Sequence, residues 1–390
     1  MTNNASAPGV LQLLPPLDRE ETVLAALETV APVVASGRSV VVASVGGRLE
    51  PQLERAGGTL ARLHAARPPI FGRDRNIDAL VSVCRENSLN LLHSHGLDNA
   101  VLGAAVSAAT GLPLVASCNE LPAKPAFGTN AHIRALSKTH RIVAASGYLA
   151  GEIARLVPRL AGRIRVVPHG INIEAFDEAA VTTARTISLA GAWGVIEDPR
   201  PIILVPARLG DDRWIGRICE VVEATVRQRA NGFDAQFVLV GEDGGTGRAA
   251  RLEGKFLASG LSPHVRLVGH CADPEAALKL ASIVLELFGE PCGVCFAALQ
   301  AQAMGRPVVL GNSGAAPEAI EDGTTGWLVE QENVTQIAQK ILAALDLDES
   351  ARAHLALAAR ARIVSKNSTK TMNRGIVSLY EECWQKVGAA

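Results

Sequence analysis

Short apolar runs alternate along most of the chain with longer segments whose apolar residues recur at helical spacing. In the first half the predicted strands are 10–14, 39–44, 90–93, 113–117, 141–145 and 164–168, and the predicted helices are 20–35, 76–86 and 100–109. In the second half the predicted strands are 202–205, 235–240, 265–268, 283–287, 308–310 and 327–329, and the predicted helices are 218–229, 248–259, 274–280, 294–304, 334–345, 350–364 and 372–386. This alternation predicts an α/β fold with parallel sheets and right-handed crossovers.

The alternation weakens once, between residues 179 and 201. Gly191, Gly194, Pro199 and Pro201 interrupt the chain there, which predicts a linker. A length of 390 residues suits two domains of ordinary size. We therefore expect one Rossmann-like domain over 1–185, a second over 186–371, and a terminal helical segment over 372–390.

Composition narrows the class of protein. Hydrophobic residues make up 48% of the chain but aromatic residues only 4%, so the cores must rest on Ala, Val, Leu and Ile. The 38 basic and 39 acidic residues leave a net charge of −1 without a long run of one sign, and no nucleic-acid partner is expected. Seven scattered cysteines, the absence of a leader pattern in residues 1–14 and the lack of a long apolar span predict a cytoplasmic protein with free thiols.

The stretch from residue 300 to 330 contains a helix, a strand, a glycine-rich turn, a short helix and another strand. Its segment AQAMGRPVV, its turn from Gly314 to Glu318 and its segment 322–329 resemble the C-terminal domain of family 4 glycosyltransferases, which are retaining enzymes of the GT-B fold. Segments 166–172, 238–242 and 265–270 also match the pattern of that family. The resemblance covers nearly the whole chain and is strongest from 202 to 330.

The resemblance implies two Rossmann-like domains that face each other across a cleft. The C-terminal domain would bind a nucleotide sugar, and the N-terminal domain a glycan or lipid-linked acceptor. The last helix, 372–390, would return to the N-terminal domain. No metal or other cofactor is implied, and contact with the inner face of a membrane would be peripheral.

The loop 288–295 leads into the predicted helix 294–304, and it is the candidate diphosphate site. Backbone N–H groups of Gly293 and Val294 at a helix N-terminus suit a phosphate, although such a loop can also simply turn the chain. By resemblance, Arg208 neutralises the leaving diphosphate, and the lysine that usually assists it is replaced by Ile215. A fork-shaped guanidinium at Arg208 suits phosphate oxygens, whereas a solvated surface arginine is the alternative.

Several other family positions are altered. The two glutamates of the donor loop fall at Cys292 and Gln300, where Glu290 could substitute for the first and the Gln300 amide could still bind a ribose hydroxyl. Asn119 stands where the family carries a catalytic histidine. By resemblance, Gly269 and His270 lie beside the nucleotide base, and Glu318 either contacts the sugar or caps a short helix. His93 and His95 are also candidates, although a structural role is favoured for both.

Cys292 and Cys295 have the C-x-x-C spacing of a redox dithiol, at a predicted helix N-terminus. The surrounding pattern is not that of thioredoxin, so this hypothesis is the weaker one. A zinc site would need two further ligands at suitable spacing, and the sequence offers none.

Three functions remain open. The leading hypothesis is a metal-independent glycosyltransferase with degenerate motifs. The alternative is a catalytically impaired relative that acts as a binding or scaffolding partner, and a third is an epimerase or phosphorylase of the same fold. The altered positions predict weak binding of nucleoside diphosphate, slow or absent transfer, and tighter binding in an Ile215→Lys variant.

Overall fold

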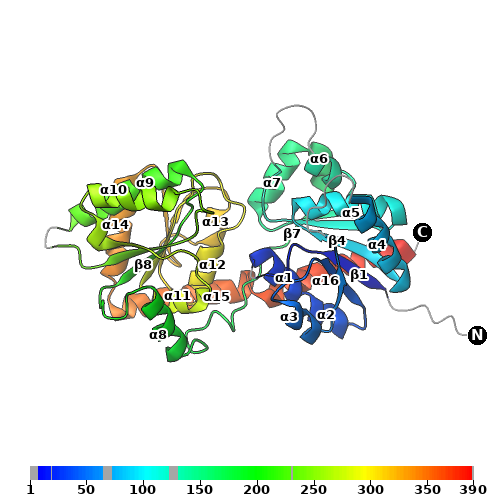
Figure 1. The fold of residues 1–390 in the computed structure, drawn as a ribbon, viewed down its shortest axis with the longest axis horizontal. Helices are drawn as coiled ribbons and strands as arrows, with labels where there is room; N and C mark the ends of the chain where they lie inside the picture. The colour runs from blue at the N-terminus through cyan, green and yellow to red at the C-terminus, as the bar shows by residue number, and fades with distance from the viewer. Residues whose placement is uncertain (1–7, 19, 65–72, 123–130, 230–231, 389–390) are drawn as a thin grey trace, which may run out of the picture. The chain divides into compact units, whose positions relative to one another are not determined.

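The computed structural model describes residues 8–18, 20–64, 73–122, 131–229 and 232–388, so half of the 1–14 segment behind the leader prediction lies outside the described residues. The chain divides into two compact units, one formed by residues 1–170 and 369–390 and the other by residues 171–368 (Figure 1). Each unit is built on one parallel sheet. Among the described residues, no helix combines the length and apolar character needed to cross a membrane.

The first unit contains a seven-stranded sheet in the order β3-β2-β1-β4-β5-β6-β7. Its strands are β1 (Gly9–Leu13), β2 (Val40–Ser44), β3 (Thr59–Arg62), β4 (Leu89–His95), β5 (Leu114–Cys118), β6 (Arg141–Ala144) and β7 (Ile164–Val166). Its helices are α1 (Glu21–Glu28), α2 (Val30–Ala35), α3 (Glu50–Arg55), α4 (Arg73–Glu86), α5 (Leu97–Thr110), α6 (Ala131–Leu136), α7 (Gly147–Leu156), the 3₁₀-helix η2 (Pro158–Arg163) and α16 (Thr369–Gly388). All paired strands are parallel, as predicted.

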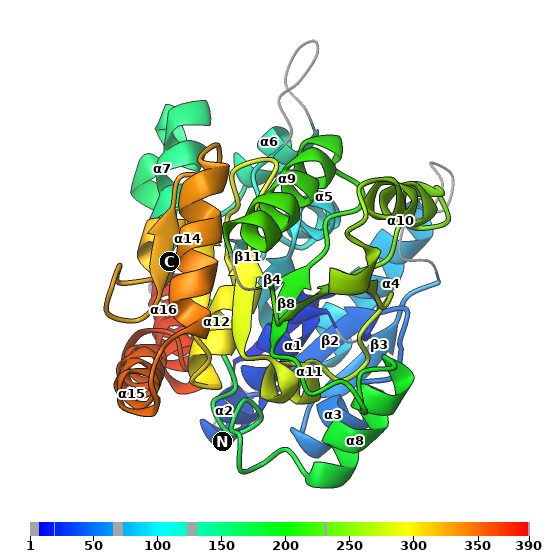
Figure 2. The ribbon, with the colours of Figure 1, turned by 90° about the vertical axis from the view of Figure 1, so that its left-hand side faces the viewer.

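The second unit contains a six-stranded parallel sheet in the order β10-β9-β8-β11-β12-β13. Its strands are β8 (Ile202–Pro206), β9 (Gln236–Val240), β10 (Val265–Leu267), β11 (Ile283–Glu286), β12 (Val308–Gly311) and β13 (Trp327–Val329). Its helices are α8 (Thr183–Ala192), α9 (Asp212–Gln228), α10 (Arg248–Ala258), the 3₁₀-helix η3 (Ser262–His264), α11 (Pro274–Leu280), α12 (Phe296–Ala303), α13 (Ala316–Ala319), α14 (Val334–Leu345) and α15 (Glu349–Lys366). Helices α9 and α14 pack side by side on one face of this sheet (Figure 2).

Strand β1 shows why these apolar runs form buried strands. Leu11 and Leu13 enter one hydrophobic cluster, whereas Val10 and Leu14 enter another on the opposite face of the sheet. Successive side chains of a strand point to opposite faces, so a strand buried between two helical layers must be apolar throughout.

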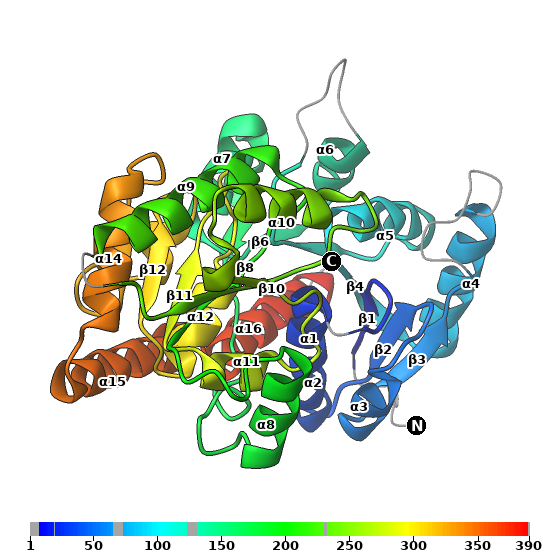
Figure 3. The ribbon, with the colours of Figure 1, turned by 60° about the vertical axis from the view of Figure 1, so that its left-hand side comes forward.

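Helix α16 belongs to the first unit, where it packs against α1 and α2 (Figure 3). Its residues Met372, Ile376, Leu379, Tyr380 and Trp384 join the cluster that contains Val10 and Leu14. Their spacing of three and four residues puts them on one face of the helix. This apolar face explains why α16 is part of a unit whose remaining residues lie far away in the sequence.

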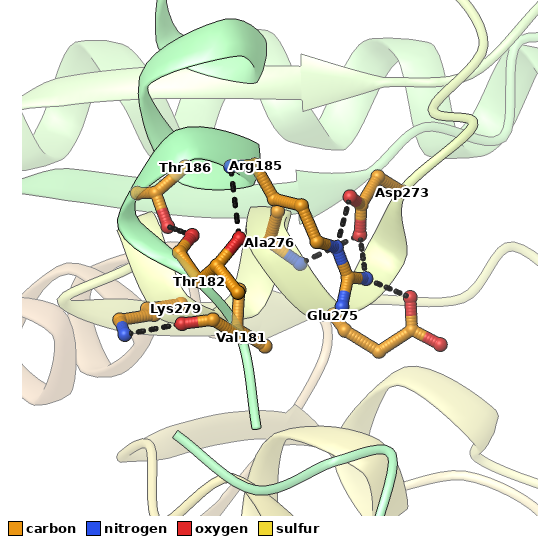
Figure 4. A network of polar contacts seen from close by, with 8 residues as sticks. All are labelled: Val181, Thr182, Arg185, Thr186, Asp273, Glu275, Ala276 and Lys279. Carbon is orange, nitrogen blue, oxygen red and sulfur yellow. Dashed lines mark hydrogen bonds and ion pairs between the residues drawn. The ribbon is translucent and has the colours of Figure 1, made fainter. Parts of the chain in front are cut away.

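Segment 171–200 belongs to the second unit and contains the helix α8, although its glycine and proline residues predict a linker there. Thr182 caps α8 by accepting from the Arg185 N–H, and the Arg185 side chain pairs with Asp273 at 2.6 Å and Glu275 at 3.1 Å at the start of α11 (Figure 4). Lys279 donates to the carbonyl of Val181 at 2.7 Å. Because these contacts connect distant residues, a search for breaks in local periodicity does not detect them.

Candidate functional site

Both sheets have the strand order of a Rossmann-type fold, in which ligands bind at the carboxyl ends of the strands where the order reverses. In the second unit that point lies between β8 and β11. Arg208 follows β8, and Glu286 is the last residue of β11. The Arg208 Nη2 lies 3.6 Å from the Glu286 Oε1, and its guanidinium lies 4.8 Å from the centroid of the Phe288 ring. The topology therefore brings a cation to the place where a ligand is expected.

Arg208 and Glu286 differ in exposure. The Arg208 side chain is 42% exposed, whereas that of Glu286 is 3% exposed. Burial raises the pKa of the Glu286 carboxyl to about 7, against the opposing effects of Arg208 and of the Ala298 N–H, which donates to Oε2 at 2.9 Å. A carboxyl with this pKa changes charge near neutral pH beside the exposed cation.

We expect the affinity of the second unit for a nucleoside diphosphate to fall as the pH rises through about 7. Below that pH Glu286 is neutral and Arg208 is available to an anion, whereas above it the carboxylate competes for Arg208 and repels phosphate. The fall should be on the order of tenfold, equivalent to about one pKa unit of linkage. Calorimetric titration with UDP and GDP between pH 6 and pH 8.5 measures it.

The control for this titration is Glu286→Gln, which keeps the shape of the side chain and the acceptor for Ala298 but does not titrate. Because the terminal phosphate of the ligand also titrates, only the difference between the two proteins reports Glu286. Equal pH dependence in both would contradict the expectation.

The raised pKa of Glu286 also makes the stability of the folded protein depend on pH. The contribution of Glu286 to the free energy of unfolding is fully present below the unfolded pKa of about 4.3 and is lost as pH rises through about 7. The variant should therefore gain stability relative to the natural protein at high pH.

The loop between β11 and α12 is held in place by side chains of neighbouring elements. The Phe288 N–H donates to the Gln331 Oε1 at 2.6 Å, and the Phe288 carbonyl accepts from the Arg217 Nη1 at 3.0 Å. A Cβ at Gly289 would collide with the Asp211 carboxylate, so a larger residue there would displace the side chain that caps α9. The loop then runs through Gly293 and buried Val294 to Cys295, the N-cap residue of α12.

Glu290 and Arg213 form an exposed ion pair at 2.9 Å, with side chains 73% and 72% exposed. Arg213 lies in the first turn of α9, after the N-cap residue Asp211, and α9 starts at the carboxyl end of β8. Glu290 therefore lies on the loop that follows β11 and reaches the N-terminus of the neighbouring helix. It is a surface carboxylate near the candidate site.

The prediction for Ile215 was wrong. Ile215 is 4% exposed and belongs to the hydrophobic core of the second unit, together with Trp214 and Ile218. Its side chain faces the sheet and not a ligand, so it does not stand where a phosphate-binding lysine would. The exposed cation of this turn is Arg213, two residues earlier.

The other predicted donor residues lie on neighbouring elements. Gly269 follows β10, has a φ of +68° and accepts the Gly241 N–H at 2.8 Å, so the ends of β9 and β10 meet there. His270 is exposed at this edge.

The remaining predicted donor residues lie on α12 and α13. Gln300 is buried in α12. Glu318 is exposed on the short helix α13, and its carbonyl accepts from Arg362. The Ala315 N–H at the start of α13 donates to the Cys292 carbonyl at 2.9 Å.

In the first unit the carboxyl ends of β4 and β5 carry a polar cluster around a small cavity of about 40 Å³. Asn119 lines it and donates to the Thr22 Oγ1 at 3.1 Å. His95 also lines it, and its buried Nε2 has no hydrogen-bond partner among the described residues. Burial lowers the pKa of His95 to about 3 and that of His169, on the same cavity, to about 4, so both rings are neutral.

His93 has a structural environment. Its Nδ1 lies 2.5 Å from the Tyr380 hydroxyl of α16, and its Nε2 lies 2.8 Å from the Ser117 Oγ. Burial and the neighbouring His95 hold the pKa of His93 well below its ordinary value. The ring therefore connects β4 to β5 and α16 as a neutral hydrogen-bonding group. The sequence does not predict the contacts of Glu286 or of Tyr380. For Glu286 a signal was available, because it is the one acidic residue in the apolar run 283–287.

Two family models match this chain. The model described as Glycosyltransferase Family 4 matches residues 27–175, and the model described as Glycosyl transferases group 1 matches residues 200–346. The chain belongs to the family 4 glycosyltransferases. Each match falls largely within one of the two units, so the family assignment covers both sheets. Both are Rossmann-like, and the fold is GT-B.

Individual relatives agree with this assignment. The chain is 26% identical, over 55% of its length and 55% of the relative, to a GDP-mannose-dependent monoacylated alpha-(1-6)-phosphatidylinositol monomannoside mannosyltransferase of Corynebacterium glutamicum. It thus spans about half the length of that relative. Its fold is similar to a glycosyltransferase of Rickettsia africae, with a TM-score of 0.82 and 20% identity over 97% of this chain and 99% of the other. It is also similar to Anabaena HepE in complex with UDP and glucose, with a TM-score of 0.77 and 19% identity over 95% and 99%.

Proposed function

We propose that this protein transfers a sugar from a nucleotide-sugar donor to a glycan or lipid-linked acceptor. The observation that carries the proposal is the position of Arg208 at the point where the strand order of the second sheet reverses, beside the loop that begins α12. Family membership supports the same reaction, and so do the transferase relative from Corynebacterium and the bound UDP of Anabaena HepE. These relatives favour transfer over a scaffolding role.

In the proposed reaction the bond between the anomeric carbon and the diphosphate breaks, and negative charge develops on the diphosphate. Arg208 stabilises that charge through a bidentate guanidinium, and the N–H groups of Gly293 and Val294, in the loop just before α12, contribute further hydrogen bonds. Arg213 supplies a second positive charge from the N-terminus of α9. These groups provide the charge stabilisation for which other enzymes use a metal ion, and the proposed mechanism includes no metal. The resemblance to family 4 implies transfer with retention at the anomeric carbon.

The acceptor is assigned to the first unit. The half-buried amide of Asn119 follows the carboxyl end of β5, and an amide suits hydroxyl groups. A sugar hydroxyl of a glycan or of a glycolipid headgroup has this chemistry. The phosphatidylinositol mannoside named for the Corynebacterium relative is an acceptor of the second kind.

A panel of UDP-, GDP- and ADP-sugars with soluble glycan and glycolipid acceptors tests the proposal. We expect one donor to bind and its nucleoside diphosphate to be released only when an acceptor is present, and NMR of the product gives the anomeric configuration. Binding without turnover of any donor would support the scaffolding alternative. Conversion of the nucleotide sugar without an acceptor would support an epimerase, and phosphate-dependent cleavage of a glycan would support a phosphorylase.

Peripheral membrane contact is part of the proposal, and a basic surface on the first unit supports it. Residues 131–165 contain seven Lys and Arg residues and one acidic residue, Glu152, in a chain whose total charge is balanced. Arg159 donates to the Ser137 Oγ at 2.8 Å and Arg163 to the Thr139 carbonyl at 2.9 Å, so both guanidinium groups contact residues that flank exposed Lys138. This surface lies at the amino ends of β6 and β7, away from the carboxyl edge of the sheet where substrates are expected.

We expect the double variant Lys138→Glu/Arg159→Glu to bind vesicles of phosphatidylglycerol and phosphatidylcholine on the order of a hundredfold more weakly than the natural protein. Each basic residue near an anionic surface contributes about 1 kcal/mol, and the reversal replaces attraction by repulsion. Sedimentation with vesicles measures the binding. The control is Arg251→Glu/Lys255→Glu on α10, which changes the net charge equally at two exposed positions of the second unit. An equal loss in both variants would show that net charge, and not this surface, controls binding.

A further inference from the structure

The two cysteines of the donor loop are in direct contact. The Cys292 and Cys295 Sγ atoms lie 3.1 Å apart, and the Cys292 Sγ lies 3.6 Å from the Ser313 carbonyl. Cys292 is 9% exposed and Cys295 1% exposed. A disulfide requires Sγ atoms at about 2.05 Å, so these two sulfur atoms need to approach each other by about 1 Å.

We propose that Cys292 and Cys295 form a reversible disulfide that fixes the 288–295 loop in the conformation of this structure. Only the effect on diphosphate binding rests on the proposed function, because the bond and its effect on the loop are properties of the fold. The oxidant is a low-molecular-weight disulfide. A low-molecular-weight thiol reverses the reaction.

Cys292 is the attacking residue because it is the more exposed of the two and follows exposed Pro291. Its thiolate attacks one sulfur of the soluble disulfide, forms a mixed disulfide and releases one thiolate. Cys295 then loses its proton to solvent and attacks the Cys292 sulfur, which forms the Cys292–Cys295 bond and expels the second thiolate. Two protein thiols are thereby oxidised, and the soluble disulfide is reduced to two thiols. The pKa of Cys295 is held well above its ordinary value by the adjacent Cys292 and by burial, so Cys295 is the poorer first nucleophile of the two.

The bond would act on the residues between the two cysteines, Gly293 and Val294. Cys295 is the N-cap residue of α12, and the backbone of Cys292 packs against the turn before α13, where its carbonyl accepts the Ala315 N–H. A Cβ at Gly314, which has a φ of +59°, would collide with that backbone. A disulfide therefore connects two points that the fold already holds. The backbone between the two cysteines is then ordered before the ligand arrives, so diphosphate binding should tighten.

The experiment treats the full chain with oxidised glutathione and follows intact mass, hydrogen exchange of peptides from the 288–299 region, and calorimetric binding of UDP and GDP. We expect the mass to fall by two hydrogens, exchange in this region to slow, and the nucleotide that binds to do so about three- to tenfold more tightly. Reduced glutathione should reverse all three changes. Cys292→Ser and Cys295→Ser should abolish them, whereas Cys219→Ser, on the partly exposed position of α9, should retain them.

Retention of the mass change in Cys292→Ser, or a stable glutathione adduct on Cys292 itself in the natural protein, would overturn the disulfide. A disulfide that leaves hydrogen exchange unchanged would overturn the effect on the loop. Failure of the proposed function gives a different result: the bond forms and exchange slows, but neither UDP nor GDP binds in either state.

Discussion

Replacing Arg208 with alanine should lower the rate of sugar transfer on the order of a hundred- to a thousandfold. Arg208 is the half-exposed cation at the reversal point of the second sheet, and removal of one group that stabilises developing charge costs about this much. Binding of the nucleoside diphosphate should weaken about ten- to a hundredfold, because one charge-assisted interaction is lost. Steady-state kinetics with the donor identified by the panel, and calorimetry with its diphosphate, measure the two effects.

The fold should survive this change. Glu286, left without its cation, stays protonated over a wider pH range, since burial already raises its pKa to about 7. Circular dichroism and thermal unfolding should therefore differ little between the two proteins near neutral pH. Loss of folded structure in Arg208→Ala would instead make Arg208 a structural residue.

Two further variants separate the contributions of the Arg208 charge, the Arg208 geometry and the neighbouring Arg213 to the rate of transfer. Arg208→Lys keeps the charge but loses the bidentate geometry, so we expect it to recover part of the rate. Arg213→Ala removes an exposed cation whose partner Glu290 is also exposed, and it should lower the rate less than Arg208→Ala. If Arg213→Ala were the more damaging of the two, the leaving diphosphate would lie nearer α9 than β8.

The apolar runs of the sequence were sufficient to predict the parallel sheets. A strand between two helical layers must be apolar on both faces, so strands such as β8 and β11 can be recognised from their runs of apolar residues. Strand β3 was missed because all four of its residues are partly or fully exposed and lack that signal. Helix α8 was missed because contacts with α11, and not its own periodicity, hold it in place.

The site was harder to predict than the fold. Arg208 could be located because it directly follows an apolar strand. Ile215 was wrongly placed in the site because its position depends on where α9 begins. A shift of one residue along a helix rotates a side chain by about 100° around the helix axis. The capping of α9 by Asp211 sets that rotation, and it directs Trp214 and Ile215 into the core and Arg213 to solvent. The burial of Glu286 depends on the packing of β11 against α12, which no local pattern contains.

Because α9 directs Ile215 into the core, the structure reverses the expectation from the sequence that Ile215→Lys binds nucleoside diphosphate more tightly. Ile215 is 4% exposed among the apolar side chains of the second core, so a lysine there must bury its ammonium or displace the start of α9. We expect the variant to lose about 2–4 kcal/mol of unfolding free energy, and its nucleoside diphosphate affinity not to rise. Urea unfolding followed by circular dichroism measures the first, and calorimetry the second.

Arg213→Lys is the matched control for this variant, because it places a lysine two residues earlier in the same turn, at an exposed position. It should unfold within about 0.5 kcal/mol of the natural protein, as surface substitutions generally do. The difference between the two lysine variants then reports the direction in which each side chain points. A stable Ile215→Lys protein that binds diphosphate more tightly would show that α9 begins in a different rotation and that position 215 faces the ligand.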